Sequence, residues 1–537
     1  MPKQARYDAV IIGSGFGGSV MALRLAQAGR SVCVLERGRR WAKEDFPRTP
    51  FQFLRSKWTA RRDGLYDFGL TGDMGGLSAS GVGGGSLIYS NVLIRAAEDV
   101  FGAAWPLEIR ERAQLDPYYD LTADMFRIRP INKVLPKSLA MEEIARRLGR
   151  ERDVVHTDLA VHFADAGQAE GQMVADPFAR GGPPQGTCNH CGSCVTGCPI
   201  HAKNTLDLNY LWLAEHKYGA EIAPLHEAGS ILPEDGGYRV KFWQRDGGRR
   251  SEGSVWAKDV VLAAGAIGST ELLLRSKRAA GGLARLSDAL GLHFSGNGDV
   301  QAGTMAMDPN IPAQSCFGPI ITRAIDFRES GVFIEEGAVP REFGGILEYL
   351  YAPFGVLATW ISAVVRGQKV QGDSDRFLAG IFRRQSPLDH ALILLVMGRD
   401  AADGKLRLSR RGRIESQWSN AGSRELFRAM EEIVGEIGEK VGGIAYFSPR
   451  WALLRRLITV HPLGGCAMAD DHTGGVVNHL GEVFHYPGLH VLDGSIIPTS
   501  IGRNPAMTIA ALAERAAFWM AHGREMAHGD ACIPRNC

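Results

Sequence analysis

The sequence predicts an α/β protein in which one domain is assembled from separated parts of the chain and a second domain is built on a sheet. Residues 7–37, 255–276 and 484–517 each contain an apolar strand, a turn and a helix. Residues 300–455 instead contain separate apolar runs such as HALILLVMG and KLRLS. Glycine accounts for 66 of the 537 residues without a collagen-like period, which indicates tight turns and backbone held close to a ligand.

Composition excludes several classes of protein. The 61 basic and 59 acidic residues give a net charge of +2, which argues against nucleic acid as the main partner. A hydrophobic fraction of 45% with 22% charged residues argues against disorder. The opening sequence MPKQARYDAVIIGSG leads an apolar run into a glycine turn, so we expect a buried strand rather than a secretory signal. These features favour a cytoplasmic protein.

The most apolar stretch of the chain is Leu350–Val365, within a wider apolar region at 344–366. It is shorter than the ~20 residues that a membrane-spanning helix needs, and it contains Pro353. We therefore expect either a buried helix or a helix that lies on a membrane surface and gives the protein a peripheral membrane contact.

The first strand–turn–helix unit contains Gly13, Gly15 and Gly18 in the spacing G-x-G-x-x-G. In a dinucleotide-binding unit these glycines allow a tight turn, the close approach of a pyrophosphate and close packing of helix on strand. Glu36 ends the second strand, where a carboxylate can accept hydrogen bonds from ribose hydroxyls. The order of these features favours a bound dinucleotide over a purely structural turn.

The first glycine motif does not distinguish NAD from FAD, but a second glycine-rich segment helps to do so. It contains Gly83, Gly84, Gly85 and Ser86 and is followed by Asn91. A second glycine loop suits a large flavin dinucleotide that is held by backbone from distant parts of the chain, although such loops are also found as plain turns.

Three C-terminal motifs resemble those of the glucose-methanol-choline (GMC) oxidoreductases, and most closely the cholesterol-oxidase branch. They are HPLGGC at residues 461–466, LDGS at 492–495 and GRNPAMTI at 502–509. The resemblance implies a Rossmann-type FAD-binding domain and a discontinuous substrate-binding domain on a mixed or antiparallel sheet. It is weak across 300–455, where the substrate is selected.

The resemblance suggests a division of the chain into five segments. We expect FAD-binding parts at 1–130, 215–299 and 456–537, a cysteine-rich segment at 131–214 and a substrate-binding domain at 300–455.

The resemblance also implies the catalytic groups. His461 and Asn504 match the family's His and Asn that face the flavin, and Asp493 with Gly494 matches a flavin contact. A neutral imidazole can accept or relay the hydroxyl proton, and an amide can donate to the same oxygen without titrating. The branch further uses a Glu of the substrate domain as a base. No motif selects among the candidates Glu335, Glu336, Glu342 and Glu348.

Four cysteines are clustered in the spacing C-x2-C-x2-C-x3-C-P. They are Cys188, Cys191, Cys194 and Cys198. This run is typical of bacterial ferredoxins, so it predicts an iron–sulfur cluster, either [4Fe–4S] or [3Fe–4S]. Structural zinc and metal-free cysteines are the alternatives. The fourth ligand is then either Cys198 or a distant cysteine. If no fourth ligand is present, the cluster is [3Fe–4S].

Together these features predict an FAD-dependent dehydrogenase that oxidises a hydrophobic alcohol, such as a sterol- or terpenoid-like alcohol. Hydride passes to the flavin, and electrons pass through the cluster to a one-electron acceptor protein or a quinone-linked carrier. The alternatives are an O2-using oxidase of the cholesterol type, with or without isomerisation, a flavin-dependent fatty-acid photodecarboxylase-like lyase, and a non-enzymatic electron carrier.

Overall fold

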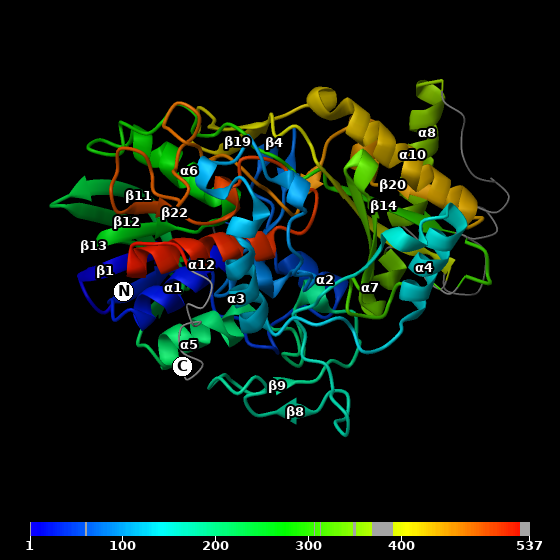
Figure 1. Ribbon diagram of the computed structural model, residues 1–537, viewed down its shortest axis with the longest axis horizontal. Helices are drawn as coiled ribbons and strands as arrows, with labels where there is room; N and C mark the ends of the chain where they lie inside the picture. Colours follow the sequence, from blue (N-terminus) through cyan, green and yellow to red (C-terminus); the bar gives the residue numbers. More distant parts are fainter. Residues whose placement is uncertain are drawn as a thin grey trace.

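The computed structural model describes residues 2–59, 62–305, 307–311, 313–346, 351–367 and 390–526. Figure 1 shows two sheets side by side, with helices packed around each. The candidate Glu348, the predicted start of the apolar segment at Leu350, and the two C-terminal cysteines Cys532 and Cys537 lie outside the described residues.

The first sheet has seven strands and is built from three distant parts of the chain. Its order is β10-β2-β1-β13-β12-β11, and β22 also pairs with β13. The strands β10, β2, β1, β13 and β22 run parallel to one another, whereas β12 and β11 add an antiparallel edge next to β13. Their bounds are β1 Arg6–Ile12, β2 Val32–Leu35, β10 Glu221–Ala223, β11 His226–Glu234, β12 Gly237–Asp246, β13 Arg249–Leu262 and β22 Leu489–Val491.

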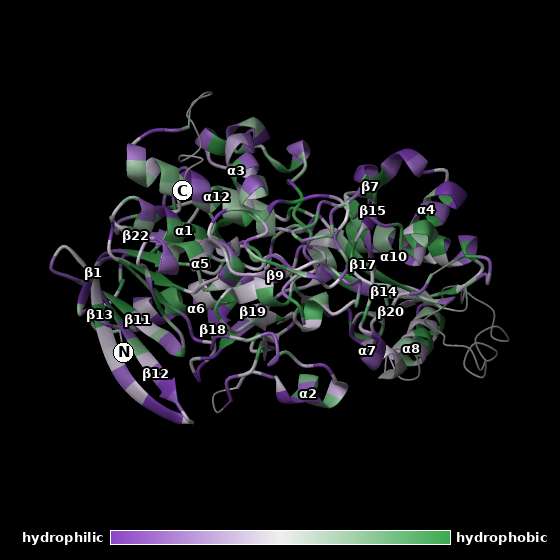
Figure 2. Cartoon of the chain, turned by 90° about the horizontal axis from the view of Figure 1, so that it is seen from below, coloured by the Kyte–Doolittle hydropathy of each residue, from purple (hydrophilic) through white to green (hydrophobic). Residues whose placement is uncertain are grey.

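Helices on this sheet bury its parallel strands. The helix α1 (Phe16–Gln27) packs against β1, whose apolar run is buried. The helices α12 (Ala506–His522) and α5 (Tyr210–His216) pack against α1 in turn. The helix α3 (Asp116–Phe126) covers α12, and α6 (Gly265–Arg278) packs against β11. Toward their free end, β12 and β13 carry mostly hydrophilic residues (Figure 2).

The second sheet has six strands and is antiparallel throughout. Its order is β20-β14-β17-β16-β15-β7. The helices α4 (Pro136–Leu148) and α10 (Arg424–Lys440) pack against it. The strand bounds are β7 Val154–His156, β14 Val300–Met305, β15 Arg323–Phe327, β16 Val332–Gly337, β17 Leu392–Gly398 and β20 Ile444–Phe447. The predicted fold class, a Rossmann-type domain joined to a domain on a mixed or antiparallel sheet, is confirmed.

The predicted cysteine-rich segment 131–214 is shared between both halves of the molecule. Its strand β7 is part of the second sheet, and its helix α4 packs against that sheet. The helix α5, which begins in this segment, packs on α1 beside the first sheet. Shorter elements complete the chain. They are α2 Pro50–Arg55, β3 Tyr66–Asp67, β4 Thr71–Gly72, β5 Gly75–Gly76, β6 Ser78–Ala79, β8 Met173–Val174, β9 Gln185–Gly186, α7 Arg341–Ile346, β18 Lys405–Leu408, β19 Ile414–Gln417, α11 Pro449–Leu454 and β21 Ile458–Thr459.

The predicted apolar segment forms α8 (Ala352–Val365), which packs against α11 and β20. One face of α8 is buried at Ala352, Val356 and Ala363, whereas Phe354, Ile361 and Val364 are exposed. The helix is largely hydrophobic in Figure 2. Among the described residues, no helix combines the length and apolarity needed to cross a bilayer.

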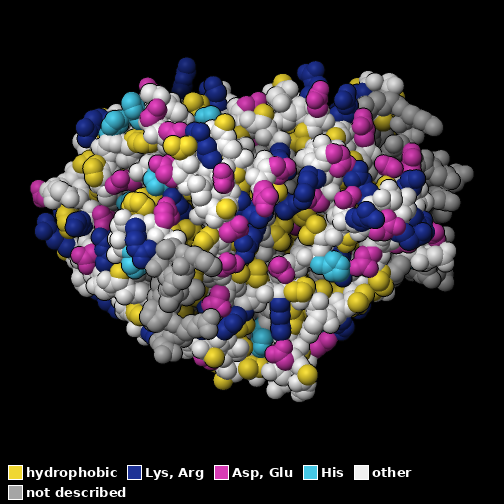
Figure 3. Space-filling view, in the orientation of Figure 1, with side chains coloured by type: hydrophobic (Ala, Val, Ile, Leu, Met, Phe, Trp, Pro, Cys, Tyr) yellow, Lys and Arg dark blue, Asp and Glu magenta, His cyan; other side chains and the backbone are white. Residues whose placement is uncertain are grey.

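Basic and acidic side chains are interspersed on the face of the molecule shown in Figure 3. This mixture agrees with the near-zero net charge of the sequence.

Candidate active site

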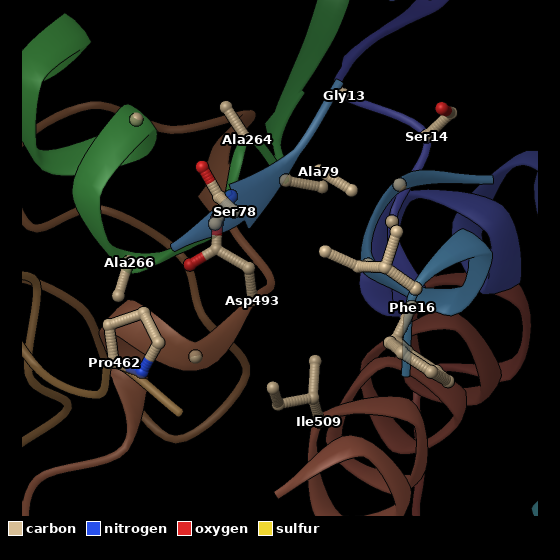
Figure 4. A pocket seen from close by; sticks show the side chains of 18 of the residues that line it. Gly13, Ser14, Phe16, Ser78, Ala79, Ala264, Ala266, Pro462, Asp493 and Ile509 are labelled. Carbon is tan, nitrogen blue, oxygen red and sulfur yellow. The ribbon is translucent and has the colours of Figure 1, made fainter. Parts of the chain in front are cut away.

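A large cavity lies where the first sheet meets the second, with an open volume of about 2090 Å³ including the solvent at its mouth. Figure 4 shows the first glycine turn, with Gly13, Ser14 and Phe16, across the open space from Pro462 and Asp493. Apolar side chains complete the wall, including Phe53, Leu77, Val92, Leu395 and Val460.

The first glycine turn has two structural glycines and one that leaves space for a ligand. A Cβ on Gly13 would lie 2.4 Å from the Ala263 carbonyl oxygen, and Gly13 also has a φ of +97°. A Cβ on Gly18 would lie 2.1 Å from the Gly13 carbonyl oxygen. A Cβ on Gly15 would meet no protein atom closer than 3.8 Å, yet Gly15 lines the cavity and precedes α1. The open space at Gly15 fits a diphosphate at the helix N-terminus.

Glu36 lies beside this turn at the end of β2 and lines the cavity. Its carboxylate accepts hydrogen bonds from the Ser14 amide (3.1 Å), the Ser14 hydroxyl (2.7 Å) and the Gly38 amide (2.8 Å). Burial raises the pKa of Glu36, although these donors oppose the rise. The predicted ribose contact therefore has a suitable position, in a carboxylate that the protein already orients.

The second glycine loop touches the first. A Cβ on Gly84 would lie 2.7 Å from the Gly15 Cα, and a Cβ on Gly85 would meet nothing within 4 Å. Gly84 and Gly85 line the large cavity, but Gly83, Ser86 and Asn91 do not. The Ser86 hydroxyl donates to the Gly83 carbonyl, which holds the loop, and Asn91 faces a second, smaller cavity.

Asp493 and Gly494 line the large cavity from the opposite side. The Asp493 carboxylate accepts hydrogen bonds from the Gly265 amide, the Ser269 hydroxyl and the Ser495 amide and hydroxyl. It thereby joins the start of α6 to the segment before α12. Burial raises the pKa of Asp493 despite these donors.

His461 lines the cavity and is oriented by a buried carboxylate that the sequence analysis missed. Its Nδ1 lies 2.9 Å from Oδ1 of Asp299, which is fully buried, and the His461 side chain is 14% exposed. Burial lowers the pKa of His461, but the charges of Asp299 and Glu335 outweigh burial and the net pKa is raised. Asp299 follows a Gly-Asn-Gly turn immediately before an apolar strand, and no motif marks it.

Asn504 also lines the cavity and contacts the Glu that the sequence could not select. The Asn504 Nδ2 donates to Oε2 of Glu335 at 3.3 Å. The Glu335 Oε1 and the Asn504 Oδ1 are buried with no hydrogen-bond partner among the described residues. Burial raises the pKa of Glu335 to about 7, with the His461 charge opposing the rise. The Asn504 Oδ1 is thus available as an acceptor, and the Glu335 Oε1 is available as an acceptor when ionised or a donor when protonated.

The other candidate Glu residues lie elsewhere. Glu336 follows Glu335 on β16 and so points to the opposite face, where it pairs with Lys137 at 2.8 Å. Both side chains of this pair are fully buried. Glu342 lies on the exposed start of α7.

The four clustered cysteines line a second cavity, together with Asn91 and Lys203, with an open volume of about 330 Å³ including solvent. Among the described residues, no group of three or more His, Cys, Asp or Glu side chains is arranged to hold a metal ion. The predicted metal site is therefore not supported as a single-ion site. The cysteines of this loop are unpaired thiols, and of the four only Cys191 is exposed.

Comparison with known proteins agrees with this geometry. The GMC oxidoreductase family models match residues 7–294 and 423–513. The chain belongs to the GMC oxidoreductase family. A cholesterol oxidase of Mycobacterium tuberculosis is 33% identical over 95% of this chain and 90% of its own. A cholesterol oxidase of Acinetobacter baumannii is 29% identical over 95% and 93%, respectively.

Other relatives of this GMC protein share the fold. A long-chain-alcohol oxidase of Arabidopsis thaliana is 24% identical over 95% of this chain and 66% of its own. A fungal aryl-alcohol oxidase structure has a TM-score of 0.61 and 14% identity, and covers 97% of this chain and 99% of its own. The chain is thus an oxidoreductase whose relatives are oxidases of alcohols. FAD is the cofactor expected in the family, and Gly15, Gly85 and Asp493 line a cavity that fits it.

Proposed function

We propose that this GMC oxidoreductase uses FAD to oxidise the hydroxyl group of a bulky hydrophobic alcohol, with sterols as the foremost substrate class. The observation that supports this most directly is that His461 and Asn504 both line the cavity, with the buried Glu335 in contact with Asn504. The apolar wall at Phe53 and Leu395 suits a large hydrocarbon, and two of the relatives are cholesterol oxidases.

Each of the three polar side chains has a role in this proposal. The Asn504 amide and the His461 Nε2 bind the hydroxyl oxygen, since Nδ1 of His461 is engaged by Asp299. The hydroxyl proton passes to His461 or Glu335, two groups whose charges affect each other's pKa. Bound FAD supplies the acceptor for the hydride from the carbinol carbon.

The test is anaerobic reduction of the bound flavin by three alcohols: cholesterol in detergent micelles, dodecanol and benzyl alcohol. We expect cholesterol to bleach the flavin absorbance fastest. His461→Gln should keep its flavin and reduce it about 10²–10⁴-fold more slowly. His472→Gln, a change at an exposed histidine, is the matched control and should behave as the wild type. Bleaching by none of the three alcohols, or an unaffected His461→Gln, would contradict the proposal.

The cysteine cavity supports a proposal for where the electrons go. Val195 and Val92 line the flavin-side cavity, while their neighbours Cys194 and Asn91 line the cysteine cavity, so the two cavities share a wall. Cys191 lies on the outer side and is exposed. A cofactor held by the four thiols would therefore lie between the flavin and the surface.

Polar groups around the cysteine cavity favour an anionic occupant. The Lys203 side chain is 2% exposed, and its Nζ donates to three backbone carbonyl oxygens, those of Leu87, Tyr89 and Cys194. Burial lowers the pKa of Lys203 to about 8, and the three acceptors match the three N–H donors of the charged ammonium. It forms no ion pair with a carboxylate in the part of the chain that the structure describes. The buried Asn91 amide lies beside Cys194 and acts to lower the pKa of that thiol, although burial raises this pKa overall.

These features support an iron–sulfur cluster as a relay to a one-electron acceptor protein. Thiolates around one ion lie about 4 Å apart, whereas thiolates that bind different irons of a cluster lie farther apart, so the lack of a single-ion site is compatible with a cluster. Anaerobically purified protein should contain iron and acid-labile sulfide. Zinc, or no metal, would refute the relay.

A second measurement separates a relay from a structural cluster. Cys194→Ser should leave flavin reduction by alcohol intact and abolish turnover with cytochrome c as the one-electron acceptor. Cys316→Ser, at a buried cysteine outside the four, is the control and should retain both steps. Hydrogen peroxide formed in equal amount to the product, in protein without iron, would instead identify an O2-using oxidase.

A further inference from the structure

The segment Ser295–Asp299 is a buried turn that leads into β14 and touches both catalytic segments. Ser295 is 1% exposed, and Asn297 and Asp299 are fully buried. We propose that this turn, hereafter the positioning turn, sets His461 and Asn504 relative to each other, with Asp299 and Asn297 as positioning residues. The proposal rests on the proposed alcohol oxidation and assigns two residues to it that no motif marks.

Asp299 binds the segment that carries His461 at four points. Its Oδ2 accepts hydrogen bonds from the Thr459 hydroxyl (2.9 Å), the Val460 amide (2.8 Å) and the His461 amide (3.1 Å). Its Oδ1 lies 2.9 Å from the His461 Nδ1. Because an ionised carboxylate only accepts, Nδ1 donates and Nε2 is left for the substrate oxygen.

Asn297 binds the segment before Asn504 in the same way. Its Oδ1 accepts hydrogen bonds from the Ile501 amide (3.1 Å), the Gly502 amide (2.7 Å) and the Ser500 hydroxyl (3.2 Å). Its Nδ2 donates to the Arg503 carbonyl oxygen at 2.8 Å. The backbone that enters Asn504 is therefore fixed by one side chain.

The positioning turn is itself rigidly held. Asp400 accepts hydrogen bonds from the Ser295 hydroxyl (2.6 Å), the Gly298 amide (3.1 Å) and the Ala402 amide (3.0 Å). Asn297 and Asp299 are two residues apart, so their Cα atoms lie within about 7 Å of each other. His461 and Asn504 come from separate segments, yet both take their positions from this one turn.

Asp299 also gives His461 and Glu335 different roles in proton transfer. The charged groups that face His461 are Asp299 from the positioning turn and Glu335 from β16. The Asp299 carboxylate stabilises the protonated imidazole, so His461 donates from Nε2 to the substrate oxygen and Glu335 receives the hydroxyl proton. Bound FAD would accept the hydride, so the proton passed to Glu335 and that hydride account for both hydrogens that the alcohol loses.

The test compares three variants by the pH dependence of anaerobic flavin reduction. Asp299→Asn should move the alkaline limb of the profile to lower pH by about 1–3 units, because the imidazolium loses its carboxylate partner. Asn297→Ala should slow reduction about 10²-fold and leave both limbs in place, because it displaces Asn504 without changing a charge. Asp400→Asn also removes a buried carboxylate that contacts the turn, but this carboxylate does not contact His461. It should therefore leave both limbs of the pH profile in place.

A measurement on the wild type keeps the proposal testable if Asp299→Asn does not fold. Side-chain 15N NMR of histidine-labelled protein, with His461→Gln for assignment, should show a protonated Nδ1 and a pKa above the ordinary 6.5. A proton on Nε2 alone, or an alkaline limb that Asp299→Asn leaves unmoved, would overturn the proposal. If no alcohol reduces the wild-type flavin, the proposed function fails, and the NMR result still decides the role of Asp299.

Discussion

Replacement of Gly15 by alanine should weaken FAD binding but leave the stability of the first glycine turn nearly unchanged. Gly15 has ordinary dihedral angles, φ −73° and ψ −165°, and an added Cβ would meet only the Ala263 carbonyl oxygen at 3.8 Å. Alanine has less backbone freedom when unfolded but is a poorer helix N-cap, and these effects oppose each other. We expect the free energy of unfolding of the flavin-free Gly15→Ala protein to change by less than about 1 kcal/mol.

FAD binding to Gly15→Ala should be strongly weakened. The new Cβ would occupy the cavity beside the N-terminus of α1, where a diphosphate approaches the backbone amides. Loss of one hydrogen bond to a charged group costs about 1.5–3 kcal/mol, which corresponds to a roughly 10- to 100-fold higher dissociation constant. The measurement is quenching of flavin fluorescence as FAD is added to the flavin-free protein, with thermal unfolding of the same sample.

Gly18→Ala is the matched control for this experiment. Its Cβ would lie 2.1 Å from the Gly13 carbonyl oxygen, so it should destabilise the protein with or without FAD. Gly85→Ala should behave like Gly15→Ala, because its Cβ meets nothing within 4 Å. The reasoning would be refuted if Gly15→Ala bound FAD as tightly as the wild type, or if its flavin-free form unfolded as readily as Gly18→Ala.

Two further predictions concern buried charges. Burial raises the pKa of Glu335 to about 7, above its unfolded value, so its contribution to stability is complete at low pH and is lost as the pH rises through about 7. Glu335→Gln should therefore be more stable than the wild type at pH 8 by up to about 3 kcal/mol and closer to it at pH 5, measured by urea unfolding of the flavin-free proteins; equal differences at both pH values would argue against this. Lys137→Met should cost about 3–5 kcal/mol because it leaves the fully buried Glu336 charge unpaired, and Lys137→Met/Glu336→Gln should recover most of the loss. Urea unfolding at pH 7 measures both, and a double variant no more stable than the single one would contradict the pairing.

The nucleotide-binding half could be predicted from sequence because its signals are local. The apolar strand β1, the glycine turn and the helix α1 lie within 22 consecutive residues, so each glycine's role follows from its place in the unit. The same holds for His461 and Asn504, which lie inside short motifs. Both residues line the cavity.

The second sheet could not be predicted at this level because its decisive contacts are not local. Glu335 and Glu336 are adjacent and chemically identical, and only the pleat and register of β16 decide which one contacts Asn504. Asp299 lies 162 residues from its partner His461, so spacing along the chain gives no signal for the pair. Asn91 was expected near the flavin by its place after the second glycine loop, yet it faces the cysteine cavity across the shared wall.

The proposed catalytic groups come from both halves of the molecule, so catalysis depends on how the two halves are joined. His461 and Asn504 come from the C-terminal part that completes the flavin-binding half, whereas Glu335 lies on β16 and Asp299 immediately precedes β14 of the second sheet. The Arg503–Asp326 and Arg399–Asp99 ion pairs cross between these parts at 2.5 and 2.8 Å. Loosening this junction would move Glu335 and Asp299 slightly away from Asn504 and His461. The glycine turns lie wholly in the first half and would still bind FAD. Because small misplacements of reacting groups cost far more rate than binding, damage at the junction should slow flavin reduction before it releases the flavin.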